Sequence, residues 1–326
     1  MSRPKIVIAG AGSIGCYVGG CLSLAGQKVR FLGRPRIIAA VAEGLHLTDY
    51  AGLDVTVKPD MTDDPATLSG ADFVLVAVKS GATSEMADHI AVHAPTATVV
   101  SLQNGVTNAA LLRDALPDAK VLAAVVPFNV VPLTPAHYHR GTSGAIMVEA
   151  GDLPDLSTTH LRWEQTDDIA GIQWGKLLIN LGNALNALSD LPLKDMLQDR
   201  AWRRLMADQM AEALRVLHAA GIKPAKTTGA PPALIPHILR LPTPLFRRIA
   251  ASMLTIDPKA RSSMWDDLTQ RRPTEIDALQ GVIIEMGKKH RVKTPLNQRM
   301  HDLIKAAETA RGGPPGIEPG DVRHAA

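Results

Sequence analysis

The feature that most constrains the fold of this chain is a run of closely spaced glycines that directly follows an apolar segment. Residues 4–10, PKIVIAG, are rich in β-branched side chains and predict a strand that stops at glycine. The chain continues as Gly10-Ala11-Gly12-Ser13-Ile14-Gly15. The last three of these residues begin a segment, 13–26, that predicts a helix. In such a turn the first glycine permits the sharp bend, the second admits a phosphate, and the third lets helix and strand pack closely. The pattern predicts a dinucleotide whose diphosphate lies at the helix N-terminus, beside Ser13 and Ile14.

Apolar and helical segments alternate along the first half of the chain. The apolar segments do not alternate with polar residues, which is typical of parallel strands that are buried on both faces. The expected strands cover 4–10, 28–33, 71–80, 96–105 and 120–131, and the expected helices cover 13–26, 35–44, 83–92 and 107–115. Residues 137–149 predict a final hairpin that closes this domain.

Helical segments dominate beyond about residue 165. They cover 168–189, 194–220, 231–255, 272–290 and 295–311, and a tail rich in glycine and proline follows. The predicted fold class is therefore α/β, with an N-terminal Rossmann-type doubly wound sheet followed by an all-helical C-terminal domain. We expect the NADP-binding domain in 1–165, the helical substrate and catalytic domain in 166–312, and a flexible tail in 313–326.

Composition excludes several kinds of partner. The 326 residues hold 35 Lys and Arg against 32 Asp and Glu, and a net charge of +3 with 3% aromatic residues does not favour nucleic acid. No apolar run approaches the length of a membrane span. Cys16 and Cys21, five apart in an expected helix, make neither a disulfide nor a metal motif, so we expect a cytoplasmic protein. Apolar helical surface in the second half is compatible with a homodimer.

The end of the second expected strand bears on the choice between NAD and NADP. An acidic residue at this place would hold the ribose 2′-hydroxyl of NAD, but the chain reads Arg34-Pro35-Arg36 and no carboxylate follows until Glu43. A guanidinium suits the 2′-phosphate of NADP, which it binds through paired charge-assisted hydrogen bonds. We predict NADP (NADPH) as cofactor, with Arg34 as the main contact; the alternative is a pair of ordinary loop arginines.

Two further polar residues follow the ends of expected strands. Lys79 closes FVLVAVKS and Asn104 lies in SLQNGV. An open α/β sheet binds its ligand at the carboxyl ends of its strands. Lys79 would there meet a phosphate or ribose and Asn104 the nicotinamide ribose or substrate, or either residue caps the helix that follows.

A polar stripe runs through the apolar segment 173–188, QWGKLLINLGNALNAL. Lys176, Asn180 and Asn183 share one helical face, and leucines fill much of the remainder. One interpretation is a structural asparagine seam below a lysine that reaches solvent. The other is a site in which the ammonium protonates the alkoxide left by hydride reduction of a ketone, while the asparagines orient polar groups of a substrate.

The segment 261–281, RSSMWDDLTQRRPTEIDALQG, holds a second group of polar residues. Ser262 and Ser263 precede its charged stretch, and Glu275 and Asp277 fit the first turn of a helix. Asp267 and Arg271 fit an exposed ion pair at i and i+4. On their own, Asp267, Arg271 and Arg272 indicate an ordinary charged surface.

The motifs GAGSIG, VKS, QNG, WGKLLIN and SSM with TEID occur in this order and together resemble the ketopantoate reductases (2-dehydropantoate 2-reductases). The resemblance runs from residue 4 to about residue 310. Such enzymes use NADPH to reduce the ketone of 2-dehydropantoate to pantoate, a precursor of pantothenate and coenzyme A. The resemblance thus implies an oxidoreductase whose partner is a small 2-oxoacid.

The same resemblance implies roles for individual residues. Lys176 would be the general acid, and Glu275 would hold the substrate and support catalysis. Ser263 would bind the substrate carboxylate, and Asn104 and Asn180 would hold cofactor and substrate. The residues that match cofactor positions are Gly10, Gly12, Gly15, Arg34 and Lys79.

Three departures from the family pattern leave the substrate open. Ala184 and Ala260 stand where asparagines are common, and the segment 125–139 differs from the stretch usual in the family. One alternative is an NAD(P)-dependent enzyme of the same plan that acts on another 2-oxoacid or hydroxyacid. A non-catalytic nucleotide-binding sensor is the other, but such a sensor has no need of Lys176 or Glu275.

Overall fold

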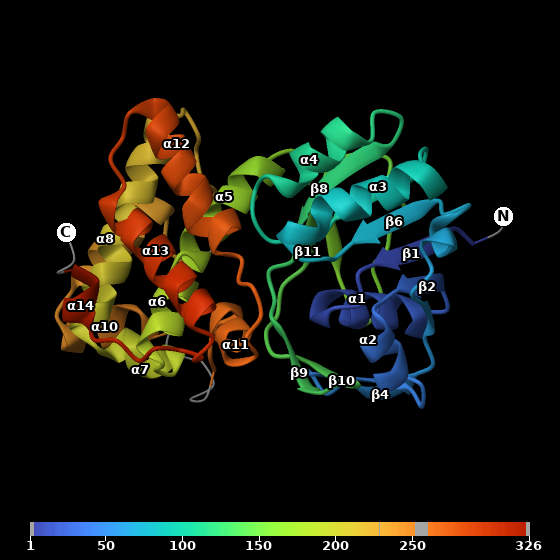
Figure 1. Ribbon diagram of the computed structural model, residues 1–326, viewed down its shortest axis with the longest axis horizontal. Coiled ribbons are helices and arrows are strands. Elements are labelled where there is room, and N and C mark those ends of the chain that lie inside the picture. The colour runs from blue at the N-terminus through green and yellow to red at the C-terminus, as the bar shows by residue number, and fades with distance from the viewer. Residues whose placement is uncertain (1–2, 228, 252–259, 324–326) are drawn as a thin grey trace. The chain divides into compact units, whose positions relative to one another are not determined.

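The structure is a computed structural model that describes residues 3–227, 229–251 and 260–323, and it divides into two compact units (Figure 1). The division falls between Ile169 and Ala170, a few residues beyond the boundary expected from the sequence. All of the strands described below lie in the first unit, and the second is helical. The predicted combination of a Rossmann-type domain with a helical C-terminal domain is therefore confirmed.

The first unit is built on an eight-stranded sheet. Its parallel strands follow the order β5-β2-β1-β6-β7-β8, so β1 is central and successive strands leave it on both sides, as in a doubly wound sheet. Their bounds are β1 Lys5–Ala9, β2 Lys28–Leu32, β5 Asp60–Thr62, β6 Phe73–Val76, β7 Thr98–Ser101 and β8 Lys120–Val125. β11 (Ile146–Glu149) pairs antiparallel with β8, and β12 (Trp163–Thr166) pairs parallel with β11. The sheet is therefore mixed at one edge, which the sequence did not predict.

Helices pack on this sheet through small and apolar residues. They are α1 Ser13–Leu24, α2 Pro35–Ala40, α3 Thr83–His93 and α4 Asn108–Ala115, with the short turns η1 Pro65–Leu68 and η2 Ser80–Ala82. A β-carbon on Gly19 of α1 would overlap the ring of Phe31, so the absence of a side chain brings α1 close to β2. Ile6, Ile8 and Phe31 are completely buried beneath it. α3 and α4 lie side by side (Figure 1).

A second sheet of four strands covers the other side of α1, and the sequence did not predict it. Its order is β4-β3-β10-β9, with β3 Leu45–Asp49, β4 Asp54–Val57, β9 Val130–Thr134 and β10 His137–Arg140. A β-carbon on Gly20 would lie 2.5 Å from Leu47, so a second glycine of α1 lets this sheet approach. The expected strand 120–131 is correspondingly two strands, β8 and β9.

The expected hairpin at 137–149 is wrong, because β10 and β11 belong to different sheets. The side chain of Arg140 holds the crossing between them. It is 5% exposed and donates hydrogen bonds to the carbonyl oxygens of Thr142, Gly144 and His160 at 2.9, 2.7 and 2.9 Å. These bonds satisfy loop carbonyls that a hairpin would have paired within its own ladder.

The second unit is formed by helices. They are α5 Ile169–Asn180, α6 Gly182–Ser189, α7 Leu193–Gln198, α8 Arg200–Ala219, η3 Pro232–Leu234, α9 Ile235–Arg240, α10 Thr243–Ile249, α11 Ser263–Thr269, the π-turn η5 Asp277–Gly281, α12 Val282–His290, α13 Pro295–Ala310 and α14 Pro319–Arg323. Several expected helices are divided. The helix expected at 194–220 breaks at Asp199, whose side chain caps α8, and the one expected at 231–255 consists of three short helices up to Ile249. Its last residues, 252–255, lie outside the described residues.

The helix expected at 168–189 is also divided, by a break at Leu181. The carbonyl oxygen of Leu181 accepts hydrogen bonds from the side-chain amides of Gln209 and Gln280, at 3.0 and 2.9 Å. Both glutamines are completely buried. The break between α5 and α6 therefore lies at the residue whose carbonyl oxygen these two buried side chains bind.

The C-terminal segment is attached to the helical unit and does not form the flexible tail expected from its composition. Ile317 donates its backbone N–H to the carbonyl of Leu188 at 3.0 Å, and Val322 in α14 is 1% exposed. Arg323 lies 2.7 Å from Asp208. The final residues, 324–326, lie outside the described residues.

The longest described helix, α8, has a strongly polar composition and contains a completely buried arginine, Arg203. Its guanidinium donates to the carbonyl oxygens of Leu239 and Leu241 and lies over the ring of Phe246, 4.3 Å from the centroid. These contacts join α8 to α9 and α10. Within the described parts of the chain, none of the helices combines the length and the apolarity that a membrane crossing requires.

Candidate active site

The glycine turn between β1 and α1 has the geometry expected of a phosphate cradle. Gly10 has a φ of +114°, and a β-carbon there would lie 2.7 Å from the backbone nitrogen of Val78. A β-carbon on Gly15 would overlap the carbonyl oxygen of Gly10, so helix and turn touch directly. Gly12, in contrast, is exposed. The atom nearest to a β-carbon placed on Gly12 would be the carbonyl oxygen of Ala77, 4.0 Å away. The space beside Gly12 and the backbone N–H groups of Ser13 and Ile14 therefore fit a diphosphate.

Arg34 lies where the sequence expects the cofactor's ribose, just beyond the carboxyl end of β2. It is the N-cap residue of α2, and its side chain is exposed, as is that of Arg36. Arg30, within β2, is instead engaged by Asp60 at 2.8 Å. Arg34 is therefore the arginine whose backbone position and exposure suit a 2′-phosphate.

Lys79 and Asn104 follow neighbouring parallel strands, β6 and β7, which pair along their length. The loop after β6 lies next to the glycine turn, because the backbone N–H of Ala77 donates to the carbonyl oxygen of Ala9 at 2.8 Å. Lys79 is the N-cap residue of η2 but does not cap it through its side chain. Lys79, Asn104 and the glycine turn thus lie at one edge of the same sheet, within the first unit.

A buried polar network holds these two loops together, and sequence reasoning missed it. The amide of Gln103 donates to the hydroxyl of Thr83 at 2.7 Å. The amide of Asn108 donates to the hydroxyl of Ser80 at 3.0 Å and to the carbonyl of Asn104 at 2.6 Å. Gln103, Thr83 and Asn108 are each less than 10% exposed, which is unusual for polar side chains. Gln103 closely follows β7, whereas Thr83 and Asn108 are the first residues of α3 and α4, so these positions were the only signal in the sequence.

Lys176 and Glu275 interact electrostatically within the helical unit. Lys176, in α5, is partly buried, and burial lowers the pKa of its ammonium to about 8. The carboxylate of Glu275 acts in the opposite sense and raises the pKa. Gly175 contributes to the enclosure, because without a side chain it lets the backbone of Ala225 approach α5. A desolvated lysine with a carboxylate near it is suited to donate a proton near neutral pH.

The asparagines of the stripe have two different environments. Asn180 ends α5 and Asn183 lies in α6 beyond the break at Leu181, and both are partly exposed. Asn186 is completely buried: its amide donates to the carbonyl of Leu191, and its oxygen accepts from the N–H of Ser262, each at 2.8 Å. Asn186 is therefore a structural link between α6 and α11, whereas Asn180 and Asn183 remain accessible.

The two serines before α11 are likewise distinguished by the structure. Ser262 is the N-cap residue: it is buried, accepts from the N–H of Trp265 at 3.2 Å, and donates to the carbonyl of Asn183 at 3.1 Å. Ser263 is the first residue of the helix, and its side chain is exposed. The hydroxyl of Ser263 is thus the one in a position to meet a ligand.

The expected exposed ion pair between Asp267 and Arg271 is wrong. Asp267 is 4% exposed and lies 3.1 Å from Arg272. Helix α11 ends at Thr269, and Arg271 adopts a left-handed φ of +54°, so the i, i+4 spacing does not apply. The pair instead closes the turn before the segment that carries Glu275.

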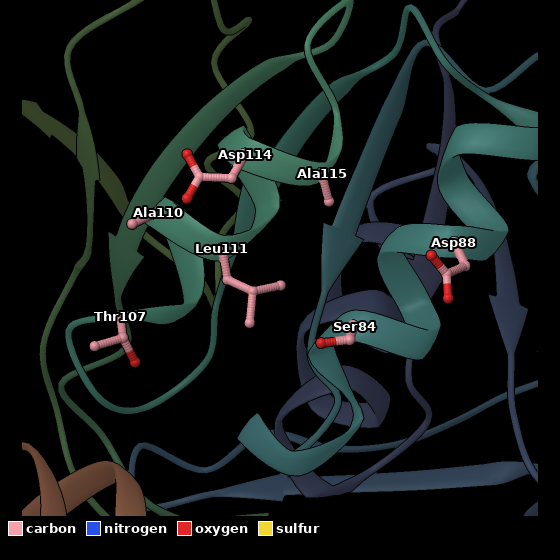
Figure 2. Close-up of a pocket in the computed structure, with 7 residues that line it drawn as sticks. All are labelled: Ser84, Asp88, Thr107, Ala110, Leu111, Asp114 and Ala115. Carbon is pink, nitrogen blue, oxygen red and sulfur yellow. The ribbon is translucent and has the colours of Figure 1, made fainter.

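A groove between α3 and α4 is shown in Figure 2. Seven residues line it: Ser84, Asp88, Thr107, Ala110, Leu111, Asp114 and Ala115. None of the residues predicted to bind cofactor or substrate is among them. Two carboxylates in this groove would repel phosphate and carboxylate groups, so it is not a candidate for the cofactor site.

The fold and these residues define a class of protein, the Rossmann-type oxidoreductases that bind a nicotinamide dinucleotide in one domain and carry a helical second domain. Comparison with known families then gives the particular family. The chain belongs to the ketopantoate reductases: residues 6–152 match the family model described as ketopantoate reductase PanE/ApbA, and residues 168–308 match the corresponding C-terminal model.

Individual relatives agree with this assignment. The chain is 25% identical to a 2-dehydropantoate 2-reductase of Halobacterium salinarum, over 93% of this chain and 99% of that protein. The crystal structure of a PanE/ApbA family ketopantoate reductase from Ralstonia eutropha superposes with a TM-score of 0.79 at 32% identity, covering 94% of this chain and 99% of that one. A D-mandelate dehydrogenase solved with NADH and anilino(oxo)acetate has the same fold, with a TM-score of 0.79 at 21% identity and 94% and 99% coverage.

Proposed function

We propose that this chain is an NADPH-dependent 2-dehydropantoate 2-reductase of the cytoplasm, which reduces the ketone of its substrate to the alcohol of pantoate. The observation that carries the proposal is the interaction of Glu275 with Lys176, whose pKa is lowered to about 8. Membership of the ketopantoate reductase family supports the reaction. The two buried free cysteines, Cys16 and Cys21, are compatible with a reducing compartment.

Reduction of a ketone needs a hydride at carbon and a proton at oxygen. Bound NADPH supplies the hydride with its electron pair. As the carbon–oxygen π bond opens, the ammonium of Lys176 stabilises the negative charge that develops on oxygen and donates the proton to it. Neutral Lys176 then regains a proton from water. Glu275 favours the ammonium form and so keeps the donor charged before each turnover.

The remaining roles follow from the chemistry of each exposed side chain. Ser263 donates to the substrate carboxylate, and the amides of Asn180 and Asn183 orient its other polar groups. Asn104 holds the nicotinamide ribose or the substrate. In the Rossmann-type unit the glycine turn holds the diphosphate, Lys79 a phosphate or ribose, and Arg34 the 2′-phosphate.

A second candidate is the reduction of a different 2-oxoacid, and the environment of Ala260 favours it. The other departure, Ala184, is completely buried in α6, so a side chain there faces the helical core. Ala260 is partly exposed and accepts the N–H of Leu193 at 2.9 Å through its backbone. An alanine at this place supplies no side-chain hydrogen bond, which suits a substrate that is less polar away from its carboxylate.

The test is the loss of NADPH absorbance with a panel of 2-oxoacids: 2-dehydropantoate, 2-oxoisovalerate, pyruvate and oxaloacetate, each with NADPH and with NADH. Turnover of 2-dehydropantoate with NADPH alone is the expected result. A different preferred acid would establish the second candidate. Absence of turnover with tight NADPH binding would instead indicate a sensor, and Lys176→Ala would then leave NADPH-linked behaviour unchanged.

We extend the proposal to a homodimer in solution. Three large apolar side chains, Leu234, Leu245 and Ile249, are 51%, 44% and 53% exposed on the helical unit. Leu234 ends η3 and Leu245 and Ile249 lie in α10, and an exposed apolar patch that such residues form together is typical of association surfaces. The mass in solution, measured by light scattering, tests this extension.

A further inference from the structure

Glu308 on α13 holds the residue immediately before Glu275. Its Oε1 oxygen accepts the backbone N–H of Thr274 at 2.7 Å and the Thr274 hydroxyl at 2.6 Å. Its other carboxylate oxygen lies 3.4 Å from the ammonium of Lys305. The side chain of Glu308 is only 16% exposed, so these bonds form largely out of water, where they are stronger. Thr274 is thus fixed to a helix that is distant in sequence.

Asp277, two residues after Glu275, is held by the same helix. Its carboxylate oxygens lie 2.8 Å from Nε2 of His301 and 2.6 Å from Nζ of Lys305. Lys305 therefore contacts both Asp277 and Glu308, while His301 also faces Asp302 at 3.3 Å. Burial raises the pKa of Asp277, but the hydrogen bonds from Lys305 and His301 outweigh this effect and lower it. The carboxyl of Asp277 is therefore charged at neutral pH.

The segment continues into an unusual turn that reaches the helix of Lys176. Asp277–Gly281 forms a π-turn, a rare element that often marks functional positions. It directs the completely buried side chain of Gln280 to the carbonyl oxygen of Leu181, one residue beyond α5. The chain on either side of Glu275 is therefore fixed at Thr274, Asp277 and Gln280.

We propose that Glu308 and Lys305 on α13, together with Asp277 in the π-turn, form a clamp that positions the Glu275 carboxylate toward Lys176. Glu308 is then a positioning residue, because it contacts Thr274 and acts on Lys176 only through Glu275. The catalytic consequence rests on the proposed function, but the geometric claim does not. In a Glu308→Ala variant the Thr274 N–H and hydroxyl lose their acceptor, and Glu275 is released from its place.

The experiment measures the titration of Lys176 directly, by NMR of reductively ¹³C-methylated lysines, with the signal assigned from Lys176→Arg. The variants are Glu275→Gln, Glu308→Ala and Glu308→Gln. The matched control is Glu285→Ala, which removes an exposed carboxylate that contacts Lys288 on α12. Thr274→Val, which removes only the hydroxyl, replaces Glu308→Ala if that variant does not fold.

We expect the Lys176 pKa to be lower in Glu275→Gln than in the wild type, because the carboxylate that raises it is lost. In Glu308→Ala the carboxylate is displaced, and the Lys176 pKa should fall by roughly half a unit. Glu308→Gln keeps an oxygen acceptor for Thr274 and should stay near the wild type, as should Glu285→Ala. A wild-type pKa in folded Glu308→Ala, alongside a lowered one in Glu275→Gln, would overturn the clamp. These titrations need no turnover, so failure of the 2-oxoacid assay would reject the proposed function without deciding the clamp.

Discussion

The side-chain amide of Gln280 donates to the carbonyl oxygen of Leu181 at 2.9 Å, and this bond lies at the break between the helix of Lys176 and the helix of Asn183. Gln209 donates to the same oxygen at 3.0 Å. Two buried amides therefore bond to the backbone at the one residue that separates the helix of Lys176 from the helix of Asn183.

Removing both amides should cost more than the sum of the single changes. Either Gln209→Leu or Gln280→Leu leaves the Leu181 carbonyl one side-chain donor, and each should cost about 1 kcal/mol of unfolding free energy. The double variant leaves this buried oxygen only the helical N–H that an N-cap carbonyl accepts, and should lose about 1 kcal/mol beyond additivity. Urea denaturation gives these values. Gln298→Leu, which removes a bond to Asp302 near the surface, is the control and should change little. Strict additivity would contradict a shared acceptor.

Gly12 and Gly15 should respond differently to alanine. Gly12→Ala meets no protein atom closer than 4.0 Å, so the thermal midpoint should hold while the new methyl group fills the diphosphate space and weakens NADPH binding. Gly15→Ala overlaps the Gly10 carbonyl and should lower both binding and stability. NADPH fluorescence titration and thermal melts distinguish the two. Gly312→Ala, which meets open space, serves as the control. Equal binding by Gly12→Ala and wild type would argue against the phosphate cradle.

Arg34→Glu should change cofactor preference. A carboxylate repels the 2′-phosphate, and the loss of paired charge-assisted bonds should weaken NADPH binding by about 10–100-fold while NADH binding changes little. Kd values for both nucleotides give the ratio. Arg162→Glu reverses a charge that is 77% exposed elsewhere in the same unit and should leave that ratio intact. Parallel weakening of both nucleotides by Arg34→Glu would refute the 2′-phosphate role.

The rate of ketone reduction should fall as the pH rises through about 8, because the donor must be the protonated form of Lys176. Glu275→Gln removes the interaction that raises this pKa, so the alkaline limb of kcat should move to lower pH. Lys176→Ala should lower kcat by about 10²–10⁴-fold. The pH–rate profiles decide the point. An alkaline limb that survives in Lys176→Ala would assign the proton to another group.

Lys176 should lower stability at neutral pH. Its folded-state pKa is lowered from 10.5 to about 8, so the unfolded chain binds more protons between these values and unfolding free energy rises with pH across that window. Lys176→Met should abolish this rise and stabilise the protein at pH 7 by on the order of 1 kcal/mol, while removing activity. Urea melts at several pH values measure both effects. Lys288→Met, at a lysine that is 67% exposed, should leave the pH dependence as in the wild type.

The sequence by itself determined the features that depend on local sterics and on period. Gly10 and Gly15 of the β1–α1 turn are required because a β-carbon at either would meet backbone atoms, and this steric requirement shows in the local glycine pattern alone. Unbroken apolar runs identified the parallel strands β1, β2, β6, β7 and β8, but not β5. The helical period placed Lys176, Asn180 and Asn183 apart from the leucines, which the structure buries.

Only the tertiary structure decided which polar residue of each pair is structural. The side chains of Ser262 and Asn186 form hydrogen bonds that join α6 to the start of α11, whereas the side chains of Ser263 and Asn183 stay accessible. The sequence likewise did not predict that β10 and β11 belong to different sheets or that α14 packs on the helical unit. In each case the deciding partner is far away in sequence, and local propensity and periodicity contain no information about a donor or acceptor that only folding brings near.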